Sequence, residues 1–285
     1  MMATTSPTIK RRQLSATLRQ LREESGMTAA EAARRLTWAP SKITRIERNE
    51  WKLPNLRDIR LLLDLYGVTD EHQCDSLLTL AKESRKRGWW ADYKDVFRSN
   101  LAAFEAGASM IRTYEVVLIP GLLQTAAYAA AVWRAGQVVD ESIIERHVQA
   151  RLARQAILER TNPPSLVAVI DEAALLRIIG GPEVMRHQVR RLIEMAARPN
   201  ITIQVLPNAV GAHAALNGAF MILDFPRPGS DPSLVYMATS TDSLWLETPE
   251  EHRRYTLLFS QVQALALSPY ESLLNLTERV EQYGK

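Results

Sequence analysis

The chain has 285 residues, a length that allows one large domain or two ordinary ones. Hydrophobic residues make up 46% and charged residues 24%, which excludes wholesale disorder. The single cysteine, Cys74, excludes an intramolecular disulfide and a multi-cysteine zinc site. No apolar run approaches the roughly 18 residues of a membrane-spanning helix, and the first residues lack the apolar core of a secretory signal. We therefore expect a cytoplasmic protein with no membrane contact.

The charge is unevenly distributed along the chain. Residues 1–90 contain 17 Lys and Arg against 11 Asp and Glu, whereas the remaining residues contain 18 against 21. A basic N-terminal third predicts contact with nucleic acid, although ordinary variation of surface charge would also account for it. No lysine lies between Lys94 and Lys285, which excludes a Ser–Lys dyad, a Schiff-base lysine and a P-loop lysine there.

The N-terminal part predicts a flexible arm and five helices. Residues 1–11 are small and polar with a basic end, so we assign them to the arm, and residues 12–87 to a helical domain. Thr28 and Glu31 have the spacing of a capping box, and Gly26 and Gly67 are natural helix stops. The predicted helices cover residues 13–25, 28–37, 40–49, 55–66 and 70–87.

A linker near Gly88 separates a second domain, residues 89–285, in which helical and strand-like segments alternate. Helices are predicted at residues 92–107, 121–135, 140–160, 182–197, 249–267 and 270–282. Strands are predicted at residues 166–170, 201–206, 220–225 and 234–238, the last two as a hairpin. The fold class is therefore a mainly α N-terminal domain followed by an α+β domain with a small antiparallel sheet.

The third predicted helix has the properties of a DNA-reading helix. Ile43 and Ile46 form its inner face, whereas its other face is polar and basic. A helix fits the major groove, where an arginine can bond guanine with two hydrogen bonds. The alternative is a helical bundle that serves only dimerisation or protein contact. We expect phosphate contacts from Thr28, Lys42, Thr44, Arg48 and Lys52.

The segment LREESGMTAAEAARRLTWAPSKITRIERNEWKLP, followed by LLLDLYGV, resembles the helix-turn-helix of XRE-type bacterial regulators. This resemblance covers residues 14–67. It implies that Pro40, Ser41 and Arg45 face the bases, and that Arg22 pairs with Glu47 behind the reading helix.

Three positions depart from that pattern. Ala29 stands where the family has Gln, so one DNA contact is missing. Thr37 stands where the turn has Gly, and because Thr resists positive φ the turn is expected to differ in shape. Ala39 replaces the usual Ser or Thr and cannot cap the reading helix with its side chain.

Four segments of the second domain resemble the C-terminal domain of antitoxin-like helix-turn-helix regulators of bacteria with GC-rich genomes. They are IPGLLQTAAYA, RQAILERTNPPSLVAVIDEAALLRIIGGPEVM, NITIQVLPNAVGAHAALNGAFMILDF and LALSPYESLL. Those regulators are typically encoded beside a small partner protein. The resemblance covers residues 89–280 and implies such a partner here.

The second domain shows no catalytic pattern, so we expect no enzyme, no cofactor and no metal. Its histidines lack metal-ligand spacing, and Asp171 with Glu172 suits the capping of a helix. A cluster of His213, Asp171 and a serine would favour an enzyme instead. The remaining candidates have two explanations. They could form a surface for a partner or ligand, or they could serve in core packing, hinge packing or a surface turn. Those candidates are Trp89, Trp90, Tyr128, Trp133 and His213.

We predict a sequence-specific transcriptional regulator that binds a double-stranded DNA operator as a homodimer. The second domain would mediate dimerisation and bind the small partner protein. The alternative is a sensor whose second domain binds a small-molecule effector in an apolar pocket and thereby shifts the spacing of the DNA-binding domains.

Overall fold

A computed structural model describes residues 6–51, 53–97, 99–136, 140–226, 232–239 and 241–283. The main division of the chain into two compact units falls between Asp92 and Tyr93. We call them the helical unit and the sheet unit. None of the described helices is both long and apolar enough to cross a membrane.

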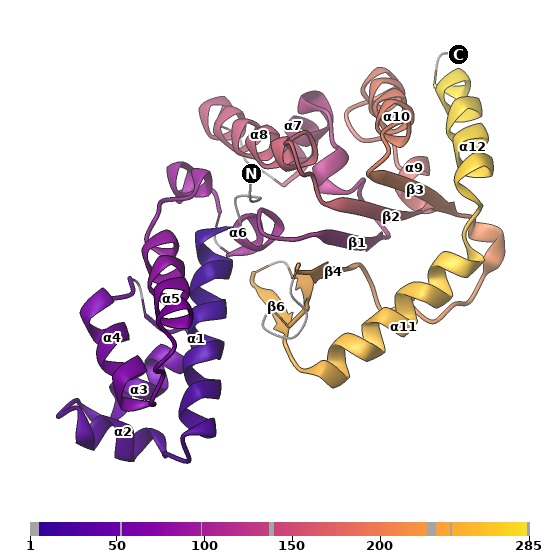
Figure 1. The fold of residues 1–285 in the computed structure, drawn as a ribbon. Helices are drawn as coiled ribbons and strands as arrows, with labels where there is room; N and C mark the ends of the chain where they lie inside the picture. Colours follow the sequence, from indigo (N-terminus) through magenta and orange to yellow (C-terminus); the bar gives the residue numbers. More distant parts are fainter. Residues whose placement is uncertain are drawn as a thin grey trace. The chain divides into compact units, whose positions relative to one another are not determined.

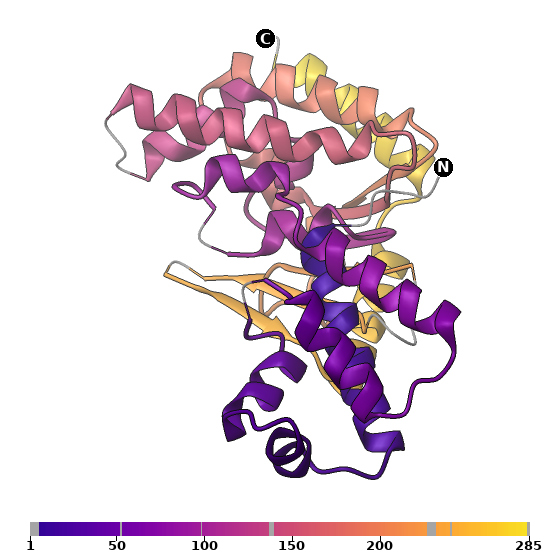
Figure 2. The same cartoon turned by 60° about the vertical axis from the view of Figure 1, so that its left-hand side comes forward.

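The helical unit contains the five helices predicted (Figures 1 and 2). They are α1 (Pro7–Glu24), α2 (Ala29–Arg35), α3 (Pro40–Glu47), α4 (Leu56–Leu65) and α5 (Glu71–Ser84). The first helix starts earlier than expected, so the assignment of residues 7–11 to a flexible arm is wrong. Pro7 occupies the first turn, where its missing N–H costs nothing and its fixed φ favours the helix. Of the rest of the predicted arm, Ser6 precedes α1 and residues 1–5 lie outside the described residues.

Local signals set the ends of these helices. Asn55 and Asp70 accept hydrogen bonds from backbone N–H groups in the first turns of α4 and α5. Thr28 accepts from the N–H of Glu31, but the Glu31 carboxylate pairs with Arg35, so only half of the expected capping box forms. The core is made of leucine, isoleucine and alanine side chains from all five helices. Its least exposed members include Leu14, Leu18, Ala32, Ile43, Ile59, Leu63 and Ala81.

The sheet unit contains six strands and seven α-helices among its described residues. The strands are β1 (Met110–Glu115), β2 (Ser165–Asp171), β3 (Ile201–Leu206), β4 (Phe220–Asp224), β5 (Leu234–Ala238) and β6 (Ser243–Leu246). The helices are α6 (Leu101–Glu105), α7 (Ala126–Ala135), α8 (Glu141–Gln155), α9 (Glu172–Leu176), α10 (Pro182–Ala196), α11 (Pro249–Leu265) and α12 (Pro269–Gln282).

The sheet is larger than predicted and mixed rather than antiparallel. Its strand order is β3-β2-β1-β4-β5-β6. The strands β1, β2 and β3 are parallel, whereas β4, β5 and β6 are antiparallel to their neighbours. The predicted hairpin of β4 and β5 is confirmed. Because two parallel neighbouring strands need a crossover connection, the chain passes through the helices α9 and α10 between β2 and β3.

Two strands, β6 and β1, were not predicted, and the predicted strands β2 and β3 pair in parallel rather than antiparallel. The strand whose sequence is least typical of a strand is β1. Its sequence MIRTYE carries charged and polar residues although the strand lies in the middle of the sheet. Tertiary partners make this possible: Arg112 pairs with Asp224 of β4, and Thr113 bonds Glu115. The helix predicted over residues 92–107 is likewise wrong, because only α6 forms as an α-helix there.

Helices cover both faces of the sheet (Figure 1). The helices α7, α8 and α10 lie on one side, and α11 crosses the other. Alternate residues of β1 point to opposite faces. Tyr114 therefore packs on the α11 side with Phe220 and Phe259, whereas Thr113 and Glu115 face the side of α8.

Thr37 adopts φ +56° in the turn between α2 and α3, the left-handed conformation that favours glycine. The expectation of a different turn is therefore wrong at this residue. A left-handed backbone costs an L-residue about 1–2 kcal/mol, while glycine adds about 0.5–1 kcal/mol of unfolded-state entropy. We expect Thr37→Gly to raise the unfolding free energy of the helical unit by up to about 1 kcal/mol.

Asn49, at φ +58°, is the matched control. Because asparagine tolerates this region and its side chain accepts a hydrogen bond from Arg11 that glycine cannot accept, Asn49→Gly should give no stabilisation. Calorimetric unfolding of both variants measures the effect. An equal or larger gain at Asn49 would show that strain at Thr37 is not the cause.

Candidate nucleic-acid interface

A short turn joins α2 to α3 and fixes their relative orientation. The N–H of Trp38 donates to the carbonyl of Ala33 at 2.8 Å. Ile43 and Ile46 are buried in the core of the helical unit. This packing directs the opposite face of α3 to solvent. Ala39, which precedes the helix, makes no side-chain cap.

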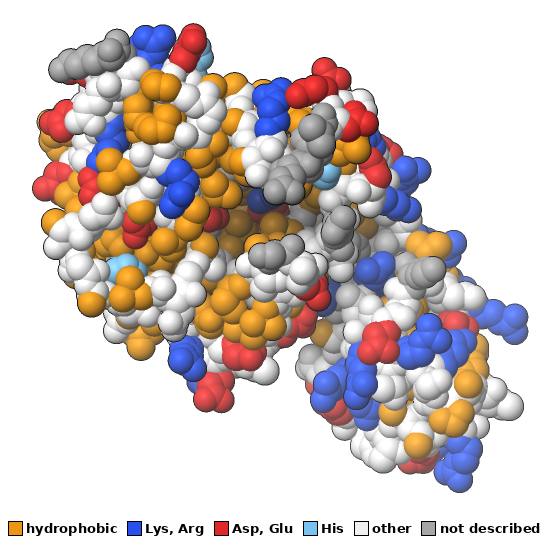
Figure 3. Space-filling model, turned by 180° about the vertical axis from the view of Figure 1, so that it is seen from behind, with side chains coloured by type: hydrophobic (Ala, Val, Ile, Leu, Met, Phe, Trp, Pro, Cys, Tyr) orange, Lys and Arg blue, Asp and Glu red, His pale blue; other side chains and the backbone are white. Residues whose placement is uncertain are grey.

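The residues expected to face bases share one exposed surface. Pro40, Ser41 and Arg45 are all exposed on α3. Arg48, expected at phosphate, is exposed at the end of the same helix. On the face seen in Figure 3, Lys and Arg side chains gather over the helical unit at the lower right. The arrangement is a basic face on a helix that can enter the major groove.

The other residues expected to contact phosphate differ in their exposure and in the partners they already have. Thr44 is half-buried, and the exposed Thr28 uses its hydroxyl to cap α2. Lys42 pairs with Asp58 at 2.7 Å, and its ammonium lies 3.6 Å from the centre of the Trp38 ring. The charge of Lys42 is thus partly neutralised within the protein. Lys52 lies outside the described residues.

An ion pair behind α3 joins it to α1. Arg22 Nε donates to Glu47 Oε1 at 2.6 Å, and a second N–H donates to Oε2 at 3.0 Å. A third donates to the carbonyl of Met27 in the loop before α2. This is the pair that the XRE resemblance implied. The hydrogen bond that Arg22 donates to Glu47 raises the pKa of Arg22, and burial followed by the Glu47 charge raises the pKa of Tyr66.

Two further contacts hold the end of α3, and sequence reasoning missed both. Trp51 Nε1 donates to the hydroxyl of Ser15 at 3.0 Å. Arg11 Nε donates to the side-chain oxygen of Asn49 at 2.9 Å. Both tie the segment after α3 to α1. The only signal was Asn49 at a helix end, because asparagine accepts a left-handed backbone there.

The five candidates for a partner or ligand surface are divided between the two units. Tyr128 is fully buried, so the interpretation as surface is wrong for this residue. Trp133 stacks on His147 at a ring distance of 4.0 Å. Trp89 and Trp90 meet edge to face in the helical unit. His213 belongs to a different cluster in the sheet unit.

The sheet unit brings His213 and Asp171 together through a tyrosine. The Tyr114 hydroxyl donates to Asp171 at 3.1 Å and lies 3.3 Å from His213 Nε2. Asp171 also caps α9, as expected from the sequence. An enzyme was expected to place a serine beside His213 and Asp171. Among the contacts described for these two residues, a tyrosine, Tyr114, occupies that place. Within the described residues, no group of three or more His, Cys, Asp or Glu side chains could hold a metal ion.

A charged cluster lies on the α8 side of the sheet. Arg154 forms two hydrogen bonds with the fully buried Glu105, at 2.5 and 2.8 Å. Arg151 donates to Gln124 at 2.8 Å. Glu115 accepts from the Thr113 hydroxyl at 3.2 Å. Burial is the main cause that raises the pKa of Glu115 to about 7 and lowers the pKa of Arg151 to about 10.

The Glu115 carboxyl makes the stability of the sheet unit depend on pH. Its folded pKa of about 7 exceeds the ordinary 4.5, so the folded state holds the proton more tightly. This stabilisation is complete below pH 4.5 and is lost as the pH rises through about 7. We expect Glu115→Gln to flatten this fall in unfolding free energy, measured by urea denaturation across the range. An unchanged pH profile in the variant would contradict the assignment to Glu115.

Replacing only one partner of the Arg22–Glu47 pair should lower the unfolding free energy strongly. The side chains of Arg22 and Glu47 are only 11% and 8% exposed, so Arg22→Met leaves a nearly buried carboxylate without its partner. We expect a loss of about 3–5 kcal/mol in the unfolding free energy. Arg22→Met combined with Glu47→Gln should recover part of it. Additive losses in the double variant would show that the two side chains are not coupled.

Comparison with known protein families identifies two regions of the chain. Residues 13–76 match a family described as a helix-turn-helix domain. Residues 98–278 match the family described as a domain of unknown function (DUF5753). No solved structure matches the chain.

Two curated relatives are similar over part of the chain. They are elongation factor G of Thermotoga petrophila (strain ATCC BAA-488 / DSM 13995 / JCM 10881 / RKU-1) and of Thermotoga sp. (strain RQ2). Each is 25% identical over 128 residues, which are 44% of this chain and 18% of the relative. The chain thus matches less than a fifth of their length. The DUF5753 match, in contrast, covers more than half of this chain, and the protein belongs to that family, with a helix-turn-helix domain preceding it.

Proposed function

We propose that this protein is a sequence-specific transcriptional regulator that reads double-stranded DNA with α3. The observation that carries the proposal is the exposed face with Ser41 and Arg45, on a helix held in place by the Arg22–Glu47 pair. The helix-turn-helix match over residues 13–76 supports the same role. An exposed arginine on such a helix has the donors that recognise guanine. The proposal contains no catalytic step, cofactor or metal.

We also propose that two chains occupy one operator. A single helical unit offers one reading helix, and one such module buries too little surface for tight specific binding. The short match to elongation factor G adds nothing to this proposal, because it leaves most of that protein uncovered.

We further propose an antitoxin-like role, in which the sheet unit binds a small partner protein. Large hydrophobic side chains on α11 and α12 support it. Leu257 is 61% exposed and Tyr270 is 70% exposed, and Leu265 and Leu274 are also exposed. Exposed large apolar side chains on two consecutive helices are groups that a protein contact would cover. The partner would act by changing the affinity of the helical unit for DNA.

A small-molecule sensor is the second candidate, and the charged cluster near α8 favours it. Glu115 and Arg151 are partly exposed there, so a polar ligand could reach them. Native mass spectrometry of the protein isolated gently from its own cells separates the two candidates. A stoichiometric small protein supports the partner, whereas a retained small molecule supports the sensor.

The DNA-binding proposal predicts a loss of specificity in Arg45→Ala. Operator DNA is first selected from a random library, and affinity is then measured for it and for random duplex. We expect the variant to weaken operator binding by about 1–3 kcal/mol and random binding much less, because Arg45 contacts a base. An unchanged ratio of the two affinities would contradict this role.

Lys42→Ala is the matched control on the same helix. A phosphate contact carries no sequence information, so operator and random DNA should weaken alike. Because Asp58 partly neutralises Lys42, the salt slope should fall by at most about one. A sequence-selective effect would move Lys42 to the base-reading group.

A further inference from the structure

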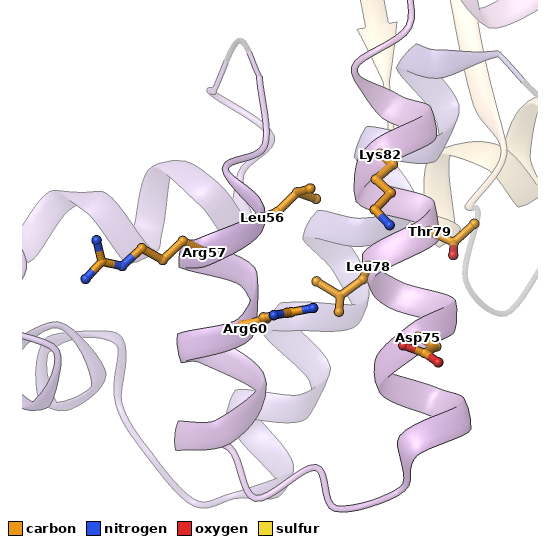
Figure 4. A pocket seen from close by; sticks show the side chains of 7 residues that line it. All are labelled: Leu56, Arg57, Arg60, Asp75, Leu78, Thr79 and Lys82. Carbon is orange, nitrogen blue, oxygen red and sulfur yellow. The ribbon is translucent and has the colours of Figure 1, made fainter.

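The segment that joins the two units has local structure on both sides of the boundary between Asp92 and Tyr93. It begins at the end of α5, a helix that packs in the core of the helical unit. Figure 4 shows Leu78 reaching from α5 toward α4, and this side chain is buried. The connection to the sheet unit therefore starts from a helix that is held in place by packing.

On the helical-unit side of the boundary, the chain folds back on itself. A Cβ on Gly88 would come within 2.3 Å of the Trp90 ring, so this ring lies directly against the glycine. Trp89 meets Trp90 edge to face at a ring distance of 6.0 Å. Arg87 donates to the carboxylate of Asp92 at 2.7 Å and closes the turn. This turn, which we call the hinge, therefore adds little free chain between the units.

On the sheet-unit side, the segment Tyr93–Phe97 docks on α8, and we call it the strap. The guanidinium of Arg146 lies 4.4 Å from the centre of the Tyr93 ring. The same guanidinium donates two hydrogen bonds to Asp95, at 3.0 and 3.1 Å. Within the strap, Phe97 meets Tyr93 edge to face, and its N–H donates to the Tyr93 carbonyl at 2.9 Å. One arginine of α8 therefore holds the strap at two points.

These two contacts are of a kind that holds a segment reversibly. The side chains of Arg146 and Asp95 are 38% and 58% exposed, and solvent screens an ion pair at such a position. A cation over a partly exposed tyrosine ring contributes a similarly small free energy. The two contacts by themselves therefore favour the docked strap only moderately over a released one.

Release of the strap would lengthen the free chain between the units. Seven residues lie between Tyr93, the end of the hinge helix, and Leu101, where α6 begins. Fully extended, at about 3.4 Å per residue, they span roughly 24 Å. That length corresponds to about seven base pairs of DNA. Docking of the strap therefore limits the reach of the connection on the scale of a DNA half-site.

We propose that the strap, by docking on α8 through Arg146, sets the separation of the two DNA half-sites that a pair of these chains can bind. The inference rests on the proposal that two chains occupy one operator, joined through their sheet units, and it names a regulation of that activity. A docked strap permits one separation, whereas a released strap tolerates several. Arg146 stands on the same helix as Arg151 of the charged cluster, so a ligand or partner that moves α8 would act on the strap.

Hydrogen exchange of the full-length protein without DNA tests the docking. The amides of Val96 and Phe97 report it, because both donate to the Tyr93 carbonyl within the strap. We expect Arg146→Ala to speed their exchange by about 3- to 30-fold, since the contact with the ring and the ion pair are both lost. Tyr93→Leu, which keeps the ion pair, should speed it by about 2- to 5-fold.

Arg134→Ala is the matched control. Arg134 donates two hydrogen bonds to Glu141 at the start of α8, in a pair that is also exposed. Its loss should leave the exchange of Val96 and Phe97 unchanged. Unchanged exchange in Arg146→Ala, or an equal rise in Arg134→Ala, would overturn the proposal.

Operators with altered spacing test the consequence for DNA binding. Two base pairs are inserted between the half-sites of the selected operator, which separates them by a further ~7 Å. Wild-type protein should lose at least about tenfold in affinity, because avidity is lost when the geometry forbids simultaneous binding. Arg146→Ala should lose less than about threefold, because the released chain takes up the added distance. Equal losses in both proteins, or a wild type that is indifferent to the insertion, would overturn the proposal.

The two measurements separate this inference from the proposed function. Protein that binds no DNA contradicts the proposed function, while hydrogen exchange still decides whether Arg146 holds the strap. Protein that binds its operator but shows no effect of Arg146→Ala contradicts the strap alone.

Discussion

The position of α3, which we propose reads DNA, depends on the ion pair between Arg22 and Glu47. The guanidinium bonds both carboxylate oxygens and the carbonyl of Met27, so one side chain connects α1, the loop before α2 and the end of α3. Both charges are nearly removed from water, where an unpaired charge is costly. The position of α3 is therefore tied to α1, and Arg45 is presented on a helix with a fixed inner face.

The turn before α3 and the segment after it add to this arrangement. Thr37 holds a left-handed backbone without the help of glycine, and Asn49 does the same at the other end. Asn49 also accepts from Arg11, while Trp51 bonds Ser15, so the exit from α3 is fixed to α1. Local strain in the turn is offset by contacts made over long sequence distances. The helix α3 is thus held at both ends and along its inner face.

The same kind of buried pairing organises the sheet unit. The central strand β1 carries Arg112, Thr113 and Glu115, and each finds a polar partner on its own face of the sheet. Glu105 is fully buried against Arg154. Charges inside the unit therefore depend on precise partners.

The sequence by itself determined the elements whose signals are local. Helical periodicity and stops such as Gly26 and Gly67 predicted the five helices of the helical unit, and hydrophobic runs predicted β2, β3, β4 and β5. The residues of α3 could be assigned to an exposed basic face because a helix has a fixed period. Only the tertiary structure decided the rest. The strand β1 has a polar sequence that becomes a central strand with the help of Asp224, far along the chain. The parallel pairing of β1, β2 and β3 made the sheet mixed rather than antiparallel. Burial of Tyr128 and the pairing of Lys42 with Asp58 likewise depend on which helices pack together, and no local pattern records that choice.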